Sequence, residues 1–114
     1  MALQFKRVRV DTASIADWPS FHDVFSSVFG FPGFYGRNMD AWIDCMTSLD
    51  SPDDGLTCVH APEDGVVVLV LAGMRDLRKR CPEIAEAIDE CSAFVNWSRM
   101  EVGETPVLIL SYYE

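Results

Sequence analysis

The sequence is short of the residues and motifs on which enzymes commonly depend. It contains only two histidines, His22 and His60, and neither has neighbours that would complete a catalytic group. A GxSxG nucleophile turn, an HExxH metal-binding pair and a phosphate-binding glycine loop are all missing. We therefore expect a protein that is not an enzyme, with no catalytic residues and no cofactor, and we expect His22 to be solvated.

Metal-binding and disulfide patterns are missing as well. The four cysteines show no CxxC spacing, so zinc and redox motifs are not supported and free thiols are expected. The acidic segment that begins at Asp50 starts like a calcium loop. Such a loop needs an oxygen ligand at its third position and a glutamate at its twelfth, where this chain has Pro52 and Ala61. No metal site is predicted.

Long hydrophobic runs and basic residues are also scarce. No run approaches the roughly 18 apolar residues needed to span a bilayer, and the N-terminus does not resemble a signal peptide, so a cytoplasmic protein is expected. Nine basic against eighteen acidic residues give a formal net charge of −9. This charge repels nucleic acid and attracts cationic partners. No nucleic-acid or membrane partner is predicted.

The sequence does contain the pattern of a single domain, residues 1–114, in which strands and helices alternate. Its hydrophobic fraction of 49% is enough to bury a core. Alternating and continuous apolar runs predict strands, and apolar repeats at i, i+3 and i+4 predict helices. The expected strands are 6–10, 66–71 and 107–110, with a short strand at 56–60 that could form a hairpin with 66–71. The expected helices are 21–29 (capped by Asp17), 39–49 and 82–94, with a short helix or turn at 75–80.

This order predicts an α/β fold in which helices pack on a mainly parallel sheet of at least three strands. The basic first strand is expected at a sheet edge, and strands 66–71 and 107–110 are expected to be covered on both faces. A loop is expected at 96–104, and residues 111–114 are expected to trail beyond the last strand. The residues expected to face inward on the last helix are Ile84, Ala87, Ile88, Cys91, Phe94 and Val95.

Residues 31–50 form the most specific stretch. The Phe-Pro-Gly segment 31–33 predicts a turn, and two aromatics that look exposed, Phe34 and Tyr35, follow it. Asn38 is a good N-cap for the helix predicted at 39–49. Asp40, Asp44 and Thr47 share one face of that helix, flanked by Ile43. The opposite, apolar face carries Met39, Trp42, Met46 and Leu49.

The two carboxylates sit one turn apart, where like charges repel by a few tenths of a kcal/mol, roughly. They do not serve the helix itself. Simple solvation accounts for carboxylates on most helices, but the residues around these two make the pattern specific. The stretch resembles the central segment of the barstar family, small inhibitors of secreted bacterial ribonucleases. The matching positions are Phe34, Tyr35, Gly36, Asn38, Met39, Asp40, Ala41, Asp44, Cys45, Met46 and Thr47.

The resemblance implies a barstar-like fold and an inhibitor of a cationic nuclease. In that family the loop and the outward helix face insert into the nuclease active site, and the carboxylate at the position of Asp44 takes the place of substrate phosphate. The implied contact residues are Phe34, Tyr35, Asp40, Ile43, Asp44 and Thr47. Arg37 stands where the best-known member is acidic, Ile43 replaces a tryptophan, and Ser48-Leu49 replaces glycine-tryptophan. These departures concern the target, so an immunity or interaction module that binds a different toxin or protein stays open.

Overall fold

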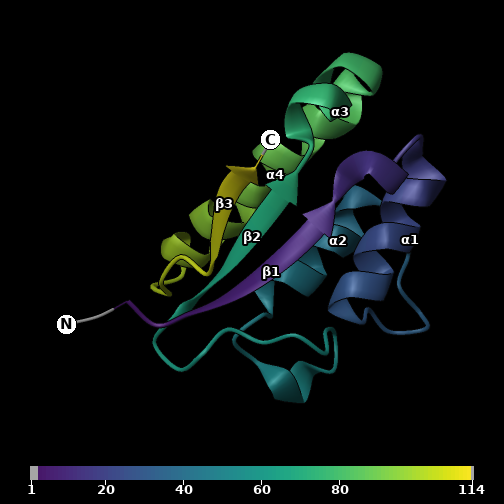
Figure 1. Cartoon of the computed structure of the whole chain (residues 1–114). Helices are drawn as coiled ribbons and strands as arrows, with labels where there is room; N and C mark the ends of the chain where they lie inside the picture. The colour runs from purple at the N-terminus through teal and green to yellow at the C-terminus, as the bar shows by residue number, and fades with distance from the viewer. Residues whose placement is uncertain (1–2, 114) are drawn as a thin grey trace.

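The computed structural model describes residues 3–113, and in this range it contains three strands and four α-helices (Figure 1). The strands are β1 (Phe5–Asp11), β2 (Val66–Ala72) and β3 (Leu108–Tyr113). The helices are α1 (Trp18–Phe29), α2 (Met39–Thr47), α3 (Met74–Arg80) and α4 (Pro82–Glu101), with short 3-10 helices at Thr12–Ser14 and Pro52–Asp54. The strands form one parallel sheet in the order β1-β2-β3, which confirms the predicted α/β fold.

The sheet has one covered face and one open face. On the covered face, Val8 and Val10 of β1 lie level with Leu69 and Leu71 of β2, and all four are buried. Helices α1, α2 and α4 lie on this side of the sheet (Figure 1). On the open face Ile109 of β3 is 41% exposed. The prediction that β2 and β3 are covered on both faces is therefore wrong, because these helices all pack on one side.

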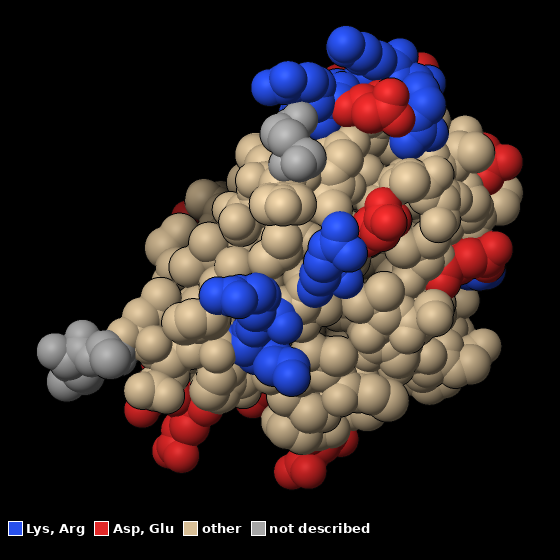
Figure 2. Space-filling view, in the orientation of Figure 1, with Lys and Arg blue, Asp and Glu red and all other residues tan. Residues whose placement is uncertain are grey.

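Strand β1 lies at an edge of the sheet, as predicted from its basic residues. Figure 2 shows the open face, where Lys and Arg side chains gather over the middle and the top of the view, at the places of β1 and α3 in Figure 1. The exposed side chains Arg7 and Arg9 belong to the first of these groups. The two acidic residues of α2, in contrast, belong to the helix layer on the other side.

Signals close together in sequence set the bounds of α1. The Asp17 carboxylate accepts a hydrogen bond from the Ser20 amide at 3.0 Å, and the Asp17 amide donates to Ser20 Oγ at 3.0 Å, which forms a capping box. Gly30 ends the helix with a φ of 68°, and a Cβ at this position would lie only 2.7 Å from Cys58 Sγ. The predicted cap and the predicted end are both confirmed.

Helix α4 is longer than predicted. It continues to Glu101, so the predicted loop at 96–104 is wrong for residues 96–101. Asn96, a residue that favours turns, is held in the helix by β3. Its Nδ2 donates to the Leu108 carbonyl at 2.7 Å, and its Oδ1 accepts from the Val107 amide at 3.0 Å. A contact between distant segments thus outweighs the local preference.

The buried face of α4 also differs from the prediction. Ser92 and Arg99 are buried, at 3% exposure each, whereas Phe94 is 47% exposed. The predicted burial of Phe94 is wrong because the polar residues Ser92 and Arg99 occupy inward positions. The inward face of α4 therefore does not coincide with its apolar residues. This exchange leaves an aromatic ring on the surface.

Residues 51–65 contain no strand, so the predicted strand at 56–60 and its hairpin are wrong. The backbone of this segment bonds the ends of helical segments instead. The Cys58 amide donates to the Phe29 carbonyl at 2.7 Å, and the Ala61 amide donates to the Leu49 carbonyl at 2.8 Å. Both edges of β2 are already taken by β1 and β3.

Strand β3 reaches Tyr113, where the sequence predicted a trailing end, because its last described residues pair with β2 up to Ala72. Within the described part of the chain, none of the helices combines the length and the apolar character needed to cross a bilayer.

Candidate partner-binding surface

Helix α2 turns two carboxylates toward solvent. Asn38 starts the helix as predicted, because its backbone is extended and its Oδ1 accepts a hydrogen bond from the Ala41 amide at 2.8 Å. Trp42 on the inner side is fully buried, which directs Asp40 and Asp44 outward, where both are exposed. Among the described residues neither carboxylate forms a salt bridge. Their negative charge is therefore available to a partner.

Ile43 and Thr47 flank this pair, and both are half-buried. The Thr47 hydroxyl donates to the Ile43 carbonyl at 2.7 Å, so its proton is already used within the helix. Thr47 can offer a partner its methyl group and an acceptor lone pair. Ile43 can offer apolar surface. The four predicted contact residues of α2 thus lie together on one side of the helix.

The two aromatic residues of the loop have different environments. Phe34 is 77% exposed. Tyr35 is half-buried, packs against Phe31 at 4.6 Å between ring centroids, and its hydroxyl forms a 2.6 Å hydrogen bond with His22 Nδ1. The prediction that both rings are exposed is therefore wrong for Tyr35. Phe34 is free to contact a partner, whereas Tyr35 anchors the loop to α1.

His22 is the other half of that anchor. It is only 4% exposed, so the prediction of a solvated histidine is wrong. Its ring lies between Trp18 and Tyr35, at centroid distances of 6.0 and 5.5 Å. Burial lowers the pKa of His22, and the nearby Arg37 lowers it further. Burial likewise raises the pKa of Tyr35, so both partners are held in their neutral forms.

The sequence offered a signal for the burial of His22. Trp18, His22, Phe25 and Phe29 are spaced as one face of a helix, and the last two of these residues are fully buried. The partner that makes burial tolerable, Tyr35, lies beyond the helix and its following turn. The spacing could therefore predict the position of His22 but not its hydrogen bond.

Arg37 is tied back to α1. Its Nη2 lies 2.9 Å from an Asp23 carboxylate oxygen and donates to the Pro19 carbonyl at 3.0 Å. Its φ of 54° is in the left-handed region, which brings the side chain toward α1. The positive charge at this departure from the family pattern is therefore paired within the protein. A hollow of about 270 Å³ lies beside it, lined by Trp18, His22, Arg37, Asn38 and Met39.

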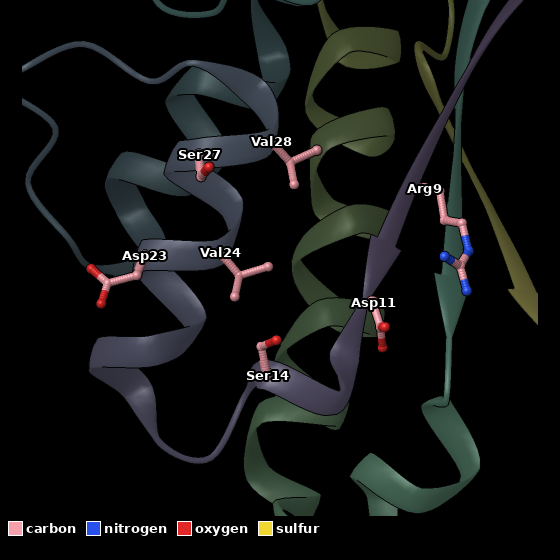
Figure 3. Close-up of a pocket in the computed structure, with 7 residues that line it drawn as sticks. All are labelled: Arg9, Asp11, Ser14, Asp23, Val24, Ser27 and Val28. Atoms are coloured by element: carbon pink, nitrogen blue, oxygen red, sulfur yellow. The ribbon is translucent and has the colours of Figure 1, made fainter.

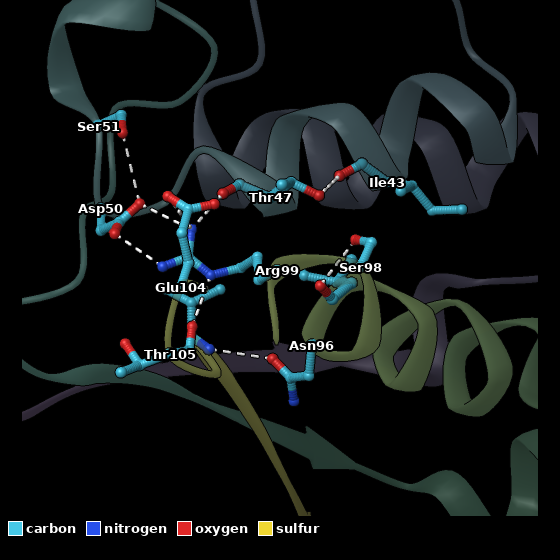
Figure 4. Close-up of polar contacts among 11 residues, drawn as sticks. Ile43, Thr47, Asp50, Ser51, Asn96, Ser98, Arg99, Glu104 and Thr105 are labelled. Carbon is cyan, nitrogen blue, oxygen red and sulfur yellow. Dashed lines mark hydrogen bonds and ion pairs between the residues drawn. The ribbon is translucent and has the colours of Figure 1, made fainter. Parts of the chain in front are cut away.

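A buried arginine on α4 supports α2 from behind (Figure 4). Arg99 binds the Asp50 carboxylate with two nitrogens, at 2.8 and 3.0 Å. It also donates to the Thr47 carbonyl at 2.9 Å and to the Thr105 carbonyl at 2.7 Å. One side chain thus joins the end of α2, the end of α4 and the segment before β3. Arg99 was not predicted as a buried residue, because the sequence indicates a loop at this position.

Asp50 responds to this arginine. The hydrogen bonds from Arg99 hold the pKa of the Asp50 carboxyl below its usual value, against the opposing effect of partial burial. The ion pair therefore favours the charged carboxylate. It ties the segment that follows α2 to α4.

Two thiols lie close to the acidic face. Cys45 is buried, and burial together with the Asp44 charge raises its pKa to about 11. Burial also raises the pKa of Cys91 on α4, with Glu90 and Asp40 adding to the shift. Both thiols stay protonated at neutral pH and are poor nucleophiles. Helices α2 and α4 pack against each other, so these thiols lie in neighbouring elements.

The groups that could support catalysis are not gathered at this surface. An open hollow of about 470 Å³ lies between α1 and β1 (Figure 3) and contains no histidine or cysteine. It is lined by Arg9, Asp11, Ser14, Asp23, Val24, Ser27 and Val28. Within residues 3–113 there is no cluster of three or more His, Cys, Asp or Glu side chains that could hold a metal ion.

A family model described as Barstar (barnase inhibitor) matches residues 5–108. This range contains the aromatic loop, the four α-helices, β1 and β2, and ends at the first residue of β3. No curated protein matches the chain.

Proposed function

Because the chain belongs to the barstar family, we propose that it is an intracellular, cytoplasmic protein that binds and inhibits a small basic ribonuclease. The observation that carries the proposal is the pair of exposed carboxylates, Asp40 and Asp44, on α2 beside the exposed ring of Phe34. The net charge of −9 supports a cationic partner. The biological role would be protection of the producing cell from its own or a delivered nuclease.

The chemistry of ribonucleases explains how such a surface would inhibit them. Their clefts hold a phosphodiester, so they carry arginine, lysine and histidine side chains arranged for an anion. Asp44, supported by Asp40, would occupy the position of the phosphate and accept charge-assisted hydrogen bonds from those groups. Phe34 would fill the part of the cleft that stacks on a base. Inhibition follows from occupation of the cleft and requires no catalytic step.

The remaining predicted residues would complete the surface. Ile43 and Thr47 would pack beside the carboxylates and exclude water from the ion pairs. Tyr35 would act indirectly, since its bond to His22 positions the loop. Arg37, paired with Asp23, would lie near the rim without adding a free positive charge against the basic cleft.

The decisive experiment is a titration of the protein into RNA-cleavage assays with barnase and other small basic bacterial ribonucleases. We expect stoichiometric inhibition of at least one enzyme. Asp44→Ala should weaken binding by about 2–5 kcal/mol, the range for removing one member of a desolvated charge pair. Asp54→Ala is the matched control, because it removes the same charge from an exposed residue in the 3-10 helix at Pro52–Asp54.

Equal inhibition by wild type and Asp44→Ala would remove α2 from the site. Loss of inhibition in both aspartate variants would instead indicate that only net charge matters. Absence of inhibition across the panel would contradict the proposal for ribonucleases.

A second candidate is an immunity module of the same fold that binds a different toxin or protein. The specific observation in its favour is the combination of Ile43 with the arginine at position 37, which makes this face less aromatic and less acidic than the resemblance implies. Capture of a partner that is not a ribonuclease by the wild type, but not by Asp44→Ala, would support this candidate.

A further inference from the structure

Helix α4 carries an exposed aromatic pair. Phe94 is 47% exposed and Trp97 is 53% exposed, with their ring centroids 5.7 Å apart. Met100, three residues after Trp97, is also 53% exposed. Single exposed apolar residues are common on proteins, but large rings grouped on one helix form a patch that usually marks an interaction site.

The patch adjoins the acidic face of α2. Cys91 and Ser98 are half-buried on α4, at positions three before and four after Phe94, so all three lie along one side of the helix. This side faces α2, because the two helices pack against each other and Ser98 lies opposite the Ile43–Thr47 turn (Figure 4). Phe94 therefore lies at the solvent edge of the seam between the two helices.

Acidic residues frame the aromatic pair. Glu90 lies four residues before Phe94, and Glu101 lies four residues after Trp97, so each is a neighbour along the helix, and both carboxylates are exposed. An apolar centre with an acidic rim is complementary to an apolar surface surrounded by basic side chains. A second copy of this chain, with its net charge of −9, would place like charges opposite one another.

We propose that Phe94 and Trp97 extend the partner-binding surface onto α4 and contact an apolar patch on the same basic nuclease whose cleft receives α2. The inference rests on the proposed function and deepens it. It states the chemistry of the partner outside the cleft: the target carries an apolar patch with a basic rim beside its phosphate-binding site. Asp40 and Asp44 supply the charged part of recognition, and the aromatic pair selects among basic nucleases.

The test uses the ribonuclease panel with the variants Phe94→Ser, Trp97→Ser and their combination. Phe5→Ser is the matched control, because Phe5 is also 47% exposed but lies on the opposite side of the sheet. For the inhibited enzyme we expect Kd to rise roughly tenfold or more for the double variant, as for buried aromatic contacts, and to stay unchanged for Phe5→Ser. Thermal unfolding should differ little between variants, since the altered side chains are exposed.

Salt dependence separates this contact from a charged one. The loss of affinity in the double variant should be the same at low and at moderate salt. The loss in Asp44→Ala should shrink as salt rises. A salt-sensitive effect of the aromatic variants would overturn the assignment of an apolar contact.

A spectroscopic readout tests burial directly. With 5-fluorotryptophan in the inhibitor, the ¹⁹F signal of Trp97, assigned by Trp97→Phe, should shift and lose its solvent isotope effect when the nuclease is added. The signal of the fully buried Trp42 should not change. A Trp97 signal that still senses solvent in the complex would contradict the proposal.

The remaining outcomes distinguish failure of this inference from failure of the proposed function. If the wild type inhibits no enzyme of the panel, both fail. If the wild type inhibits and the aromatic variants inhibit equally well, this inference alone is overturned. If light scattering shows that the protein alone self-associates and that the double variant does not, the patch belongs to a second copy and the assignment to the nuclease is wrong.

Discussion

His22 and Tyr35 control the loop that carries Phe34. Their 2.6 Å hydrogen bond joins α1 to the loop. His22 is buried and Tyr35 is half-buried. The polar atoms at the centre of this aromatic cluster satisfy each other, so the cluster tolerates them. The loop that carries Phe34 is therefore anchored to α1 when a partner contacts it.

The lowered pKa of His22 predicts a pH-dependent stability. The unfolded chain takes up a proton near pH 6.5, whereas the folded chain resists protonation until a lower pH. The full contribution is present above the unfolded value of 6.5 and is lost as pH falls toward the lowered folded value. Urea unfolding measured between pH 5 and 7.5 should show stability that rises with pH.

Substitution of His22 tests the cause of this dependence. His22→Gln should flatten the slope between pH 5 and 7.5. Asp17 and Asp50, whose pKa values are lowered below 3.8, act in a more acidic range and do not interfere. A slope that survives in His22→Gln would show that another group is responsible.

At the scale of elements, α2 depends on α4 for its orientation. Arg99 holds the last carbonyl of α2 and the carboxylate of Asp50, and it is only 3% exposed. An arginine in this position cannot be replaced by an apolar residue without leaving acceptors unsatisfied. The angle of the acidic face is thus set by a residue that a partner does not touch.

Arg99→Met should lower the free energy of unfolding by about 2–4 kcal/mol. Breaking a buried ion pair costs about 3–5 kcal/mol, and the partial exposure of Asp50 reduces that value. Inhibition should weaken as well, because α2 loses its support. Urea unfolding and the cleavage assay measure the two effects.

The dependence of unfolding free energy on pH in the acidic range tests whether the Arg99–Asp50 ion pair causes this loss. The contribution of Asp50 is present above its unfolded pKa of 3.8 and is lost as pH falls through its lowered folded value, so this pH dependence should be diminished in Arg99→Met. Arg99→Lys keeps the charge but not the two-nitrogen geometry, and it should lie between wild type and Arg99→Met. An Arg99→Met protein as stable as wild type would contradict this role.

Elements with local signals could be predicted from the sequence, and those fixed by distant contacts could not. Asp17, Gly30 and Asn38 set the ends of α1 and the start of α2 through neighbours within a few residues. The outward direction of Asp40 and Asp44 followed from the apolar face behind them. The length of α4 could not be predicted, because it depends on β3.

The same reason explains the errors at the candidate surface. The burial of His22 requires Tyr35, which lies in the next loop. The exposure of Phe94 follows from the inward position of Arg99, whose partners come from α2 and from the segment before β3. Each error involves a polar residue that is buried because residues from another segment of the chain form hydrogen bonds with it.

At the scale of the whole molecule, the basic residues are concentrated on two elements, away from the acidic face of α2. Seven of the nine basic residues lie on β1 and α3, and the other two, Arg37 and Arg99, are each paired with a carboxylate. The exposed carboxylates of α2 lie on the helix layer, whereas the arginines of β1 point to the open face of the sheet (Figure 1). A cationic partner is therefore attracted to one side of the molecule.

This separation predicts association kinetics. The association rate constant with an inhibited nuclease should fall several-fold between roughly 50 and 500 mM salt, while the dissociation rate constant changes less. Asp40→Asn should lower the association rate constant, and Lys79→Ala, an exposed change on α3, should leave it nearly unchanged. Stopped-flow fluorescence provides both constants. An association rate constant independent of salt would contradict electrostatic steering.

The order of the strands also sets when the protein becomes active during synthesis. Within the described residues β1 pairs with β2 alone, so Phe5 has no strand partner until Val66 has been synthesised. The other neighbour of β2 is β3, which is synthesised last. The loop and α2 emerge from the ribosome early but have no sheet to pack against until the later strands follow, and such non-local pairing slows folding. A chain built this way presents α2 on a finished sheet only after synthesis ends. If it inhibits a nuclease as we propose, a cell must hold a finished supply before the nuclease appears.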